Sequence, residues 1–235
     1  MISREALIKL LEQKEQVLFI NEISVDKLSE MFGSDFAAMK GYSQNSPHHC
    51  YDLLTHTLHS INNLDVFCSN PKELPFLKVA ALYHDVGKPS VVQQKNGRSV
   101  FYGHAAKSAE ILKPILVQMG FNLQEIERIM FYVKHHDDFI SFKLHDEMPP
   151  KKNPYIKLIS PLEVKKQISQ TIKKCETSHE YLPSKVDYIN LLSLCCADAS
   201  AQSETVTVNG IDIDGRDRKI KRMKTIQSII EKDIL

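Results

Sequence analysis

A nearly continuous apolar segment in the second quarter of the chain constrains the fold most, because it ends on two polar side chains. Residues 74–82 (LPFLKVAAL) are almost all apolar and predict a helix over 74–86 that lies in the core. This segment runs directly into residues 83–89 (YHDVGKP). A buried helix that ends on His84 and Asp85 delivers an imidazole and a carboxylate to one point, and we expect that point to hold a divalent metal ion.

The length and composition of the chain fit one large domain, or one domain with a cap. The chain has 235 residues, of which 43% are hydrophobic and 25% charged, as in ordinary globular proteins. Its net charge of +1 gives no nucleic-acid footprint by itself. No apolar run approaches the roughly 20 residues of a membrane span, and the first residues do not resemble a signal peptide. We therefore expect a cytoplasmic protein that makes no membrane contact.

Hydrophobic spacing predicts helices through most of the remaining chain. Residues 33–47 lack this spacing and are interpreted either as a lid or as a packed surface loop. Asn96-Gly97 lies between two β-prone runs and predicts a hairpin, the one clear strand pair in the chain. The sequence thus predicts an all-α fold with one small β-hairpin. The further predicted helices cover residues 1–16, a short stretch that starts at Ser24, and residues 48–62, 105–119, 123–135, 161–175, 184–199 and 216–233.

Ligand-type side chains occur on several of these apolar helices. His56 belongs to helix 48–62, His84 and Asp85 end the core helix, and Asp198 lies in an apolar stretch near the end of helix 184–199. Polar groups in such positions are costly unless they have partners. A shared divalent cation would compensate all four together, and a core network of hydrogen bonds is the alternative.

A second set of histidines follows the hairpin. His104 comes directly after it, and His135-His136 ends helix 123–135. Added to the first set, they suffice for two ions bridged by Asp85, which can hold both oxygens of a phosphoryl transfer. The alternative is that these histidines contact substrate around a single ion.

Several cations are candidates for contact with a phosphate. Lys88 lies three residues after Asp85 and would pair with phosphate as a point charge. Arg98 and Lys107, near the hairpin, are further candidates for substrate binding. The alternative for each is a solvated surface cation. The basic run 216–223 leaves a contact with RNA or DNA open.

The order of these motifs resembles a known family. His56, His84-Asp85 and Asp198 are similar to the H…HD…D signature of the HD superfamily of metal-dependent phosphohydrolases. Residues 82–89 resemble its central motif and residues 54–59 its first. Residues 101–105, 133–137 and 196–202 resemble the branch found in CCA-adding tRNA nucleotidyltransferases. The resemblance covers roughly residues 48–213, and the chain is divided accordingly. Residues 1–47 form an N-terminal helical extension or lid, residues 48–213 an HD phosphohydrolase domain, and residues 214–235 a basic helix that packs on it or flanks it.

The resemblance implies which residues bind metal. One ion would be held by the first set, and in members with extra histidines a second ion is held as well. In this chain the second ion would map onto His104 with His135 or His136, and the choice between the adjacent pair stays open. Asp52 matches an acidic position of some members, where it is a ligand or orients His56. The full set of expected metal ligands is His56, His84, Asp85, His104, His135, His136 and Asp198.

The resemblance implies hydrolysis of phosphate esters, with Asp85, Lys88 and His104 as catalytic residues. Metal-bound water, shared between two ions through Asp85, would attack phosphorus while His104 or Lys88 steadies the phosphate oxygens. The expected cofactor is one or two divalent ions, with Mn, Ni, Co, Fe, Mg and Zn as candidates.

The expected substrate is a phosphorylated small molecule or a nucleic-acid end, either a phosphomonoester or a 2′,3′-cyclic phosphate of a nucleotide. The alternative is a non-catalytic HD module that contains metal and binds RNA or a partner protein. The sequence shows no Gly-Ser pair followed by paired aspartates in a sheet context, so we do not expect the chain to add nucleotides.

Overall fold

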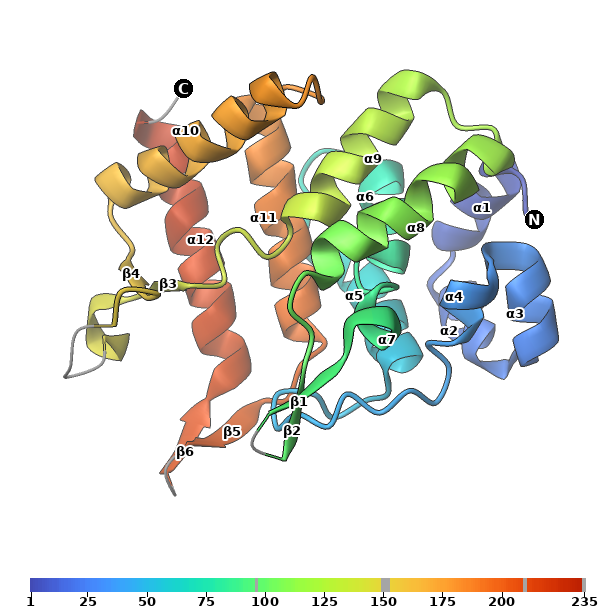
Figure 1. Cartoon of the computed structure of the whole chain (residues 1–235), viewed down its shortest axis with the longest axis horizontal. Coiled ribbons are helices and arrows are strands. Elements are labelled where there is room, and N and C mark those ends of the chain that lie inside the picture. The colour runs from blue at the N-terminus through green and yellow to red at the C-terminus, as the bar shows by residue number, and fades with distance from the viewer. Residues whose placement is uncertain (96, 149–152, 209–210, 234–235) are drawn as a thin grey trace.

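The computed structural model describes residues 1–95, 97–148, 153–208 and 211–233, and most of them are helical (Figure 1), which confirms the predicted all-α class. None of the described helices combines the length and the apolar composition needed to cross a bilayer. The helices are α1 (Arg4–Leu11), α2 (Lys14–Phe19), η1 (Ile20–Glu22), α3 (Val25–Phe32), α4 (Ser34–Ala37), α5 (Leu53–Phe67), α6 (Leu74–Tyr83), α7 (Lys88–Val91), α8 (His104–Met119), α9 (Leu123–His135), η2 (His145–Glu147), α10 (Pro161–Thr177), α11 (Lys185–Ser200) and α12 (Gly215–Asp233). The strands are β1 (Gln93–Lys95), β2 (Arg98–Val100), β3 (Phe142–Lys143), β4 (Lys157–Leu158), β5 (Thr205–Val208) and β6 (Ile211–Asp214).

Helix α6 lies at the centre of the molecule, as its apolar sequence predicts. Every side chain from Leu77 to Tyr83 is buried, α5 and α9 pack against the helix, and α11 packs along α5. The buried set includes the charged Lys78, whose Nζ donates to Leu11 O at 2.9 Å and pairs with Asp65 at 2.9 Å. These two partners compensate the cost of burying the ammonium group.

The prediction of a single helix over residues 1–16 is wrong. Helix α1 ends at Leu11, and α2 starts at Lys14 after an extended residue, Gln13. Both Leu11 and Val17 are buried in the core. In an unbroken helix their directions would differ by about 120°, so the break lets both side chains reach the interior.

The first histidine-bearing helix begins at Leu53, and not at residue 48 as predicted. Asp52 is its N-cap, because its Oδ1 accepts a hydrogen bond from Thr55 N at 2.7 Å. Its Oδ2 accepts from Gly41 N at 3.2 Å, which ties α5 to the segment 33–47. Asp52 is therefore occupied as a cap at the start of α5.

Segment 33–47 packs against the body of the protein over its first half. It contains the short helix α4, and Phe36 and Met39 are fully buried. Phe36 contacts Tyr83 of the core helix, with ring centroids 5.5 Å apart. This burial favours the packed-loop interpretation over a lid for residues 34–39.

Three small strand pairs accompany the helices. The antiparallel pair β1–β2, with Gln94 opposite Ser99, confirms the predicted hairpin, although Asn96 of its turn lies outside the described residues. The parallel pair β3–β4 and the antiparallel pair β5–β6 were not predicted as pairs.

The C-terminal helix α12 runs beside α11 in Figure 1 and packs along it. Met223, Ile226 and Ile230 form its buried stripe. Arg222 joins the helix to the turn η2, because its Nε and Nη2 donate to both carboxylate oxygens of Glu147 at 2.8 and 2.7 Å. These contacts place one face of α12 against the rest of the protein.

Candidate metal centre

Two groups of ligand-type side chains meet at one place in the structure. Four helices contribute residues at or near one of their ends, and α5 contributes a residue from within the helix. The first group contains one histidine from α5, the His-Asp pair after α6, and an aspartate from α11. The second shares Asp85 with the first and adds histidines at the start of α8 and just after α9. Within each group the ligand-type atoms lie within 4.8 Å of one another. The groups are His56, His84, Asp85 and Asp198, and Asp85, His104 and His136.

The first group sets two imidazoles against two carboxylates. His56 Nε2 forms a hydrogen bond with Asp198 Oδ1 at 2.8 Å. His84 Nε2 lies 3.4 Å from the same oxygen and 3.2 Å from Asp85 Oδ2, and His56 Nε2 is 4.0 Å from that second oxygen. A mixture of imidazole nitrogen and carboxylate oxygen suits divalent first-row ions.

Asp85 joins the two groups, since its two oxygens face different histidines. Oδ2 faces His84, whereas Oδ1 lies 3.1 Å from His104 Nε2 and 3.8 Å from His136 Nε2. A carboxylate that directs one oxygen at each of two ligand sets has the arrangement needed to bridge two cations about 3.5–4 Å apart.

Each of the four histidines forms a hydrogen bond from Nδ1 to a backbone carbonyl, where Nδ1–H must be the donor. This bond fixes the ring orientation and leaves Nε2 to face the cluster, as is usual for histidines that bind metal. For three of them the acceptor is the carbonyl three residues earlier, and for His56 it is distant in sequence. The acceptors are Ala81 O for His84 (2.7 Å), Phe101 O for His104 (2.9 Å), Val133 O for His136 (2.8 Å) and Ala201 O for His56 (3.1 Å).

The local backbone explains two of these bonds. His84 and His136 are the C-cap residues of α6 and α9. The last carbonyls of a helix have no partner within it. The imidazole of a C-cap histidine satisfies one of them, so the end of the helix itself aims Nε2 outward.

Polar atoms of the cluster lack partners within the described part of the chain. His84 Nε2 and Asp85 Oδ1 are buried and make no hydrogen bond there. His104 Nε2 and His136 Nε2 face each other at 3.1 Å, so two acceptors oppose each other if both rings carry hydrogen only on Nδ1. A divalent cation in contact with these atoms would give the unpartnered atoms a partner and would bind the two facing nitrogens, so the donor set fits a metal.

Burial and neighbouring charges shift the pKa values of the cluster in opposite directions. Burial disfavours the imidazolium form of His84, but Asp85 and Asp198 outweigh it and raise its pKa to about 10. Burial opposes ionisation of Asp85 as well, yet His84, Lys88 and His104 lower its pKa well below the usual range. Both shifts come from the same pairing of imidazole with carboxylate, and coordination of a cation through Nε2 would compete with protonation of His84.

Gly87 lets α8 approach the turn that carries His84 and Asp85. A Cβ atom at this position would lie 2.6 Å from Ser108 N and 2.8 Å from His104 O, which are both backbone atoms. The amide of Gly87 also donates to Ser108 Oγ at 2.9 Å. The missing side chain is therefore what allows His104 to reach Asp85.

Lys88 is buried beside Asp85. Its Nζ lies 2.6 Å from Asp85 Oδ2 and donates to Gln44 Oε1 at 2.9 Å. The ammonium also lies 5.5 Å from the centre of the Phe101 ring. The ammonium group of Lys88 is thus fixed on the side of Asp85 that faces the first ligand group.

A cavity of about 600 Å³ opens over the cluster, a volume within the range of small-molecule sites. Its walls come from residues 46–49, from the connection between β2 and α8, and from the ends of α9 and α11. Lys219 of α12 completes them. The cluster residues that line the cavity are Asp85, His104, His136 and Asp198, and Lys88 lines it beside them.

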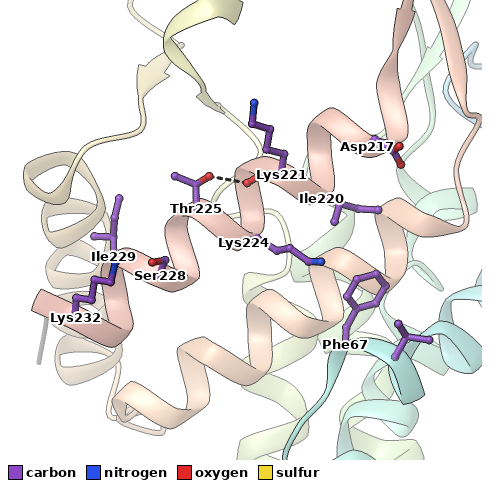
Figure 2. Close-up of a pocket in the computed structure, with 10 residues that line it drawn as sticks. Phe67, Asp217, Ile220, Lys221, Lys224, Thr225, Ser228, Ile229 and Lys232 are labelled. Atoms are coloured by element: carbon purple, nitrogen blue, oxygen red, sulfur yellow. Dashed lines mark hydrogen bonds between the residues drawn. The ribbon is translucent and has the colours of Figure 1, made fainter.

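A larger hollow of about 840 Å³ lies on the outer side of α12, as Figure 2 shows. Lys221, Lys224 and Lys232 stand along the helix there, and Lys224 Nζ lies 5.5 Å from the centre of the Phe67 ring. The described residues that line this hollow include no histidine or cysteine. It is therefore separate from the candidate metal centre.

The structure brings six of the seven predicted metal ligands together and leaves out His135. The Nδ1 of His135 forms a hydrogen bond with Asp138 Oδ2 at 3.0 Å, and Thr171 Oγ1 donates to the same oxygen at 2.8 Å. His135 also lines a different surface hollow, beside Phe131 and Tyr181. Of the adjacent pair, His136 is the residue that faces the cluster.

Two of the predicted substrate cations lie outside the cavity. Arg98 is exposed on β2 and lines a surface hollow with Gly41 and Asp52. Lys107 forms an ion pair with Glu110 at 2.7 Å on α8. Neither side chain lines the cavity over the cluster.

Three polar residues at the cavity were not predicted as site residues. Asp137 Oδ2 lies 3.3 Å from His104 Nε2. Gln202 Nε2 donates to Asp198 Oδ2 at 3.3 Å, and Lys219 Nζ donates to Gln202 Oε1. The sequence did contain a signal that Lys219 faces the protein interior, because this residue continues the apolar stripe of α12 at helical spacing.

Comparison with known proteins gives the family. A model of the HD domain matches residues 53–178, which is more than half of the chain. The chain belongs to the HD domain family. The matched part of this HD domain contains His56, His84, Asp85, His104 and His136, whereas Asp198 and Lys219 lie beyond it.

The chain is also similar to a CC-adding tRNA nucleotidyltransferase of Thermus thermophilus. The two are 34% identical over 107 residues, which are 44% of this chain and 24% of the relative. The similarity thus spans about a quarter of the relative's length. HD domains are in general metal-dependent hydrolases, and the buried His/Asp cluster of this chain is a group that could hold divalent metal.

Proposed function

We propose that this HD domain hydrolyses a phosphate ester of a nucleotide or of a nucleic-acid end, and that the cluster binds one or two divalent cations. The observation that carries the proposal is the position of Asp85. Its two oxygens face different ligand groups: Oδ2 lies 3.2 Å from His84 Nε2, and Oδ1 lies 3.1 Å from His104 Nε2. This geometry fits a pair of ions better than a single one.

The ligands of the two cations follow from the two groups. His56, His84 and Asp198 would hold one ion with Asp85, and His104 and His136 would hold the other with the second oxygen of Asp85. When bound, such cations polarise a phosphoryl oxygen and lower the pKa of a coordinated water.

The residues of the chain position the substrate and balance its charge. Lys88 lines the cavity next to Asp85, so its ammonium can neutralise a phosphate oxygen that approaches this carboxylate. Hydrogen bonds to Phe101 O and Val133 O hold the rings of His104 and His136 and keep their Nε2 atoms directed at the same point. Little rearrangement of the protein would be needed when substrate binds, which favours catalysis by preorganised charges.

The cavity and the relative both favour a nucleotide or an RNA end as substrate. A volume of about 600 Å³ accommodates a nucleotide-sized ligand. The relative is a CC-adding tRNA nucleotidyltransferase, so part of this chain is similar to part of a protein that acts on tRNA. We therefore expect a phosphomonoester or a 2′,3′-cyclic phosphate of a nucleotide to be cleaved.

The test is hydrolysis by the purified chain after loading with Mn²⁺, Ni²⁺, Co²⁺ or Mg²⁺. A panel of nucleoside monophosphates and 2′,3′-cyclic nucleotides is followed by chromatography, and bound metal is counted by elemental analysis. We expect turnover with at least one ester and one to two ions per chain. Asp85→Asn should lower both metal content and turnover, because it removes the anionic carboxylate shared by the two groups.

His59→Ala is the matched control for His56→Ala. Both histidines lie on α5, but the His59 ring stacks on Tyr51 at 4.6 Å and lies outside the cluster. His56→Ala should lose metal and activity, whereas His59→Ala should keep both. If the metal-loaded chain binds its ions and cleaves no ester in the panel, the proposal is wrong and a non-catalytic metal-containing module takes its place.

A further inference from the structure

Asp198 uses its two carboxylate oxygens differently. Oδ1 faces the imidazoles of the first ligand group, at 2.8 Å from His56 Nε2 and 3.4 Å from His84 Nε2. Oδ2 instead accepts a hydrogen bond from Gln202 Nε2 at 3.3 Å. One oxygen of this candidate ligand is therefore directed at the cluster, and the other is held by a side chain that belongs to neither ligand group.

The local backbone brings Gln202 to Asp198. Gln202 lies four residues after Asp198, and its N donates to Ala199 O at 3.1 Å just beyond the end of α11. Residues four apart in such a turn lie on the same side of the chain. The next residue is anchored as well, because Ser203 N donates to His48 O at 2.9 Å. Gln202 is therefore held beside Asp198 by its own backbone.

Lys219 fixes the side-chain amide of Gln202 from the other end. Lys219 Nζ donates to Gln202 Oε1, and an ammonium group can only donate. The amide must then turn Nε2 toward Asp198, whose ionised carboxylate can only accept. Gln202 is buried, so the loss of either partner would leave a polar atom unsatisfied.

Helix α12 supplies Lys219 from outside the part of the chain that matches the family model. Lys219 lies four residues before Met223 and continues the buried stripe of this helix, which packs along α11. Lys219 and Asp198 both line the cavity over the cluster and a small cavity beside it. The contact from Lys219 through Gln202 to Asp198 therefore joins α12 to the candidate metal centre.

We propose that Lys219 and Gln202 are positioning residues: they hold Oδ2 of Asp198, so that this carboxylate presents only Oδ1 to the ion of the first ligand group. This role rests on the metal-binding part of the proposed function and not on ester hydrolysis. Hydrogen-bond partners of metal ligands typically contribute a factor of about 10–100 to the affinity of a site for its metal.

The charge of Lys219 and its positioning role have opposite effects on metal affinity. An ammonium group near a bound cation repels it, so removal of the charge alone should tighten metal binding. Loss of the hydrogen bond from Lys219 instead frees the amide of Gln202 and then the carboxylate of Asp198, which should weaken metal binding. The direction of the change therefore separates positioning from a purely electrostatic role.

Equilibrium dialysis of the metal-free full chain against Mn²⁺ measures the change. Gln202→Leu keeps most of the side-chain volume and removes both hydrogen bonds, so it should weaken binding to the first ligand group by about tenfold or more. Lys219→Met keeps the apolar stem and removes the donor, so it should weaken the same ion by a smaller factor. Ions held by His104 and His136 should be unaffected, so each variant should lose at most one ion per chain at limiting Mn²⁺.

The double variant tests whether Lys219 acts through Gln202. In the Gln202→Leu chain, the further change Lys219→Met should no longer weaken binding, because the amide on which Lys219 acts is absent. Lys219→Arg restores a donor and should recover most of the wild-type affinity. The visible absorption of the Co²⁺-loaded chain should change in Gln202→Leu and in Lys219→Met, since Asp198 then contacts the ion differently.

Lys221→Met is the matched control, because Lys221 stands on the outer side of the same helix, as Figure 2 shows. This variant should bind Mn²⁺ and absorb with Co²⁺ as wild type does. Gln202→Leu and Lys219→Met change opposite ends of one contact, so either variant suffices if the other does not fold.

Equal or tighter Mn²⁺ binding by Lys219→Met would refute the positioning role, and so would an unchanged affinity of Gln202→Leu. An effect of Lys219→Met that persists in the double variant would also refute it, because Lys219 would then act without Gln202. These outcomes leave the proposed function standing. Weakened metal binding in the variants of a chain that cleaves no ester would refute the proposed function and leave the positioning role. A wild-type chain that binds no divalent cation would refute both.

Discussion

Gly87→Ala tests whether the close approach of α8 to the turn after α6 assembles the centre. Gly87 has φ −80° and ψ −12°, a helical conformation in which alanine would normally stabilise the protein by about 0.4–1 kcal/mol through the unfolded state. In this structure the new Cβ would meet Ser108 N at 2.6 Å and His104 O at 2.8 Å. Ordinary contact begins at 3.4 Å, so α8 would have to retreat by roughly 0.8 Å.

The retreat sets the expected magnitude. Overpacking of this kind costs about 1–3 kcal/mol, and the gain from alanine offsets part of it, which leaves a loss of about 1–2 kcal/mol. For a chain of this size the melting temperature should fall by roughly 2–8 °C. The distance between His104 Nε2 and Asp85 Oδ1, now 3.1 Å, should lengthen, so the second ligand group should lose metal before the first.

Thermal unfolding of the metal-free chain measures the first effect, and metal counting after equilibration with limiting Mn²⁺ measures the second. Gly41→Ala is the control, because a Cβ there meets nothing within 4 Å while φ is +69°. It should cost about 1 kcal/mol from backbone strain alone and leave metal content unchanged. A Gly87→Ala chain that is as stable as wild type, or more stable, and binds as much metal would refute the reasoning.

Three further predictions concern other contacts. His136→Ala should lower the number of ions bound, whereas His135→Ala should not, since only His136 faces the cluster; metal analysis of both variants decides this. Glu147→Gln should destabilise the chain by about 3–5 kcal/mol in denaturant unfolding, because it leaves Arg222 with an unpaired charge near the protein interior. Burial opposes ionisation of Glu147, but Arg222 and the amide of Leu144 lower its pKa, so its contribution is present above the unfolded pKa of about 4.3 and is lost as pH falls through the folded pKa. Unfolding measured between pH 6 and pH 3 should therefore lose less stability in Glu147→Gln than in wild type.

The parts of the centre that could be predicted are those set by short-range patterns. The apolar run of α6 required a buried helix, and a His-Asp pair at its end had to lie at the edge of the core. The start of α5 was missed by five residues, because apolar spacing continues backwards past a cap. The hydrogen bond from Thr55 N to the side chain of Asp52 sets the residue at which the helix begins.

Other features depend on directions that the sequence does not fix. Adjacent residues on a helix point about 100° apart, so either His135 or His136 could face a metal until the packing of α9 is known. The helix is interrupted between Leu11 and Val17, because both side chains must reach the same core. Lys219 belongs to a basic run in which the sequence does not distinguish one lysine from another. The packing of α12 against α11 decides that Lys219 points inward, whereas other lysines of the same helix line the outer hollow.

The carbonyl partners of the histidines imply an order of assembly for the centre. Three rings are oriented by the chain three residues before them, so each acquires its direction as soon as its own turn of backbone forms. His56 instead depends on Ala201 O, 145 positions away in the sequence. It can adopt its final direction only when the end of α11 docks on α5. Capture of an ion by His56 would therefore require this docking, and it would link the completeness of the centre to the contact between α5 and α11.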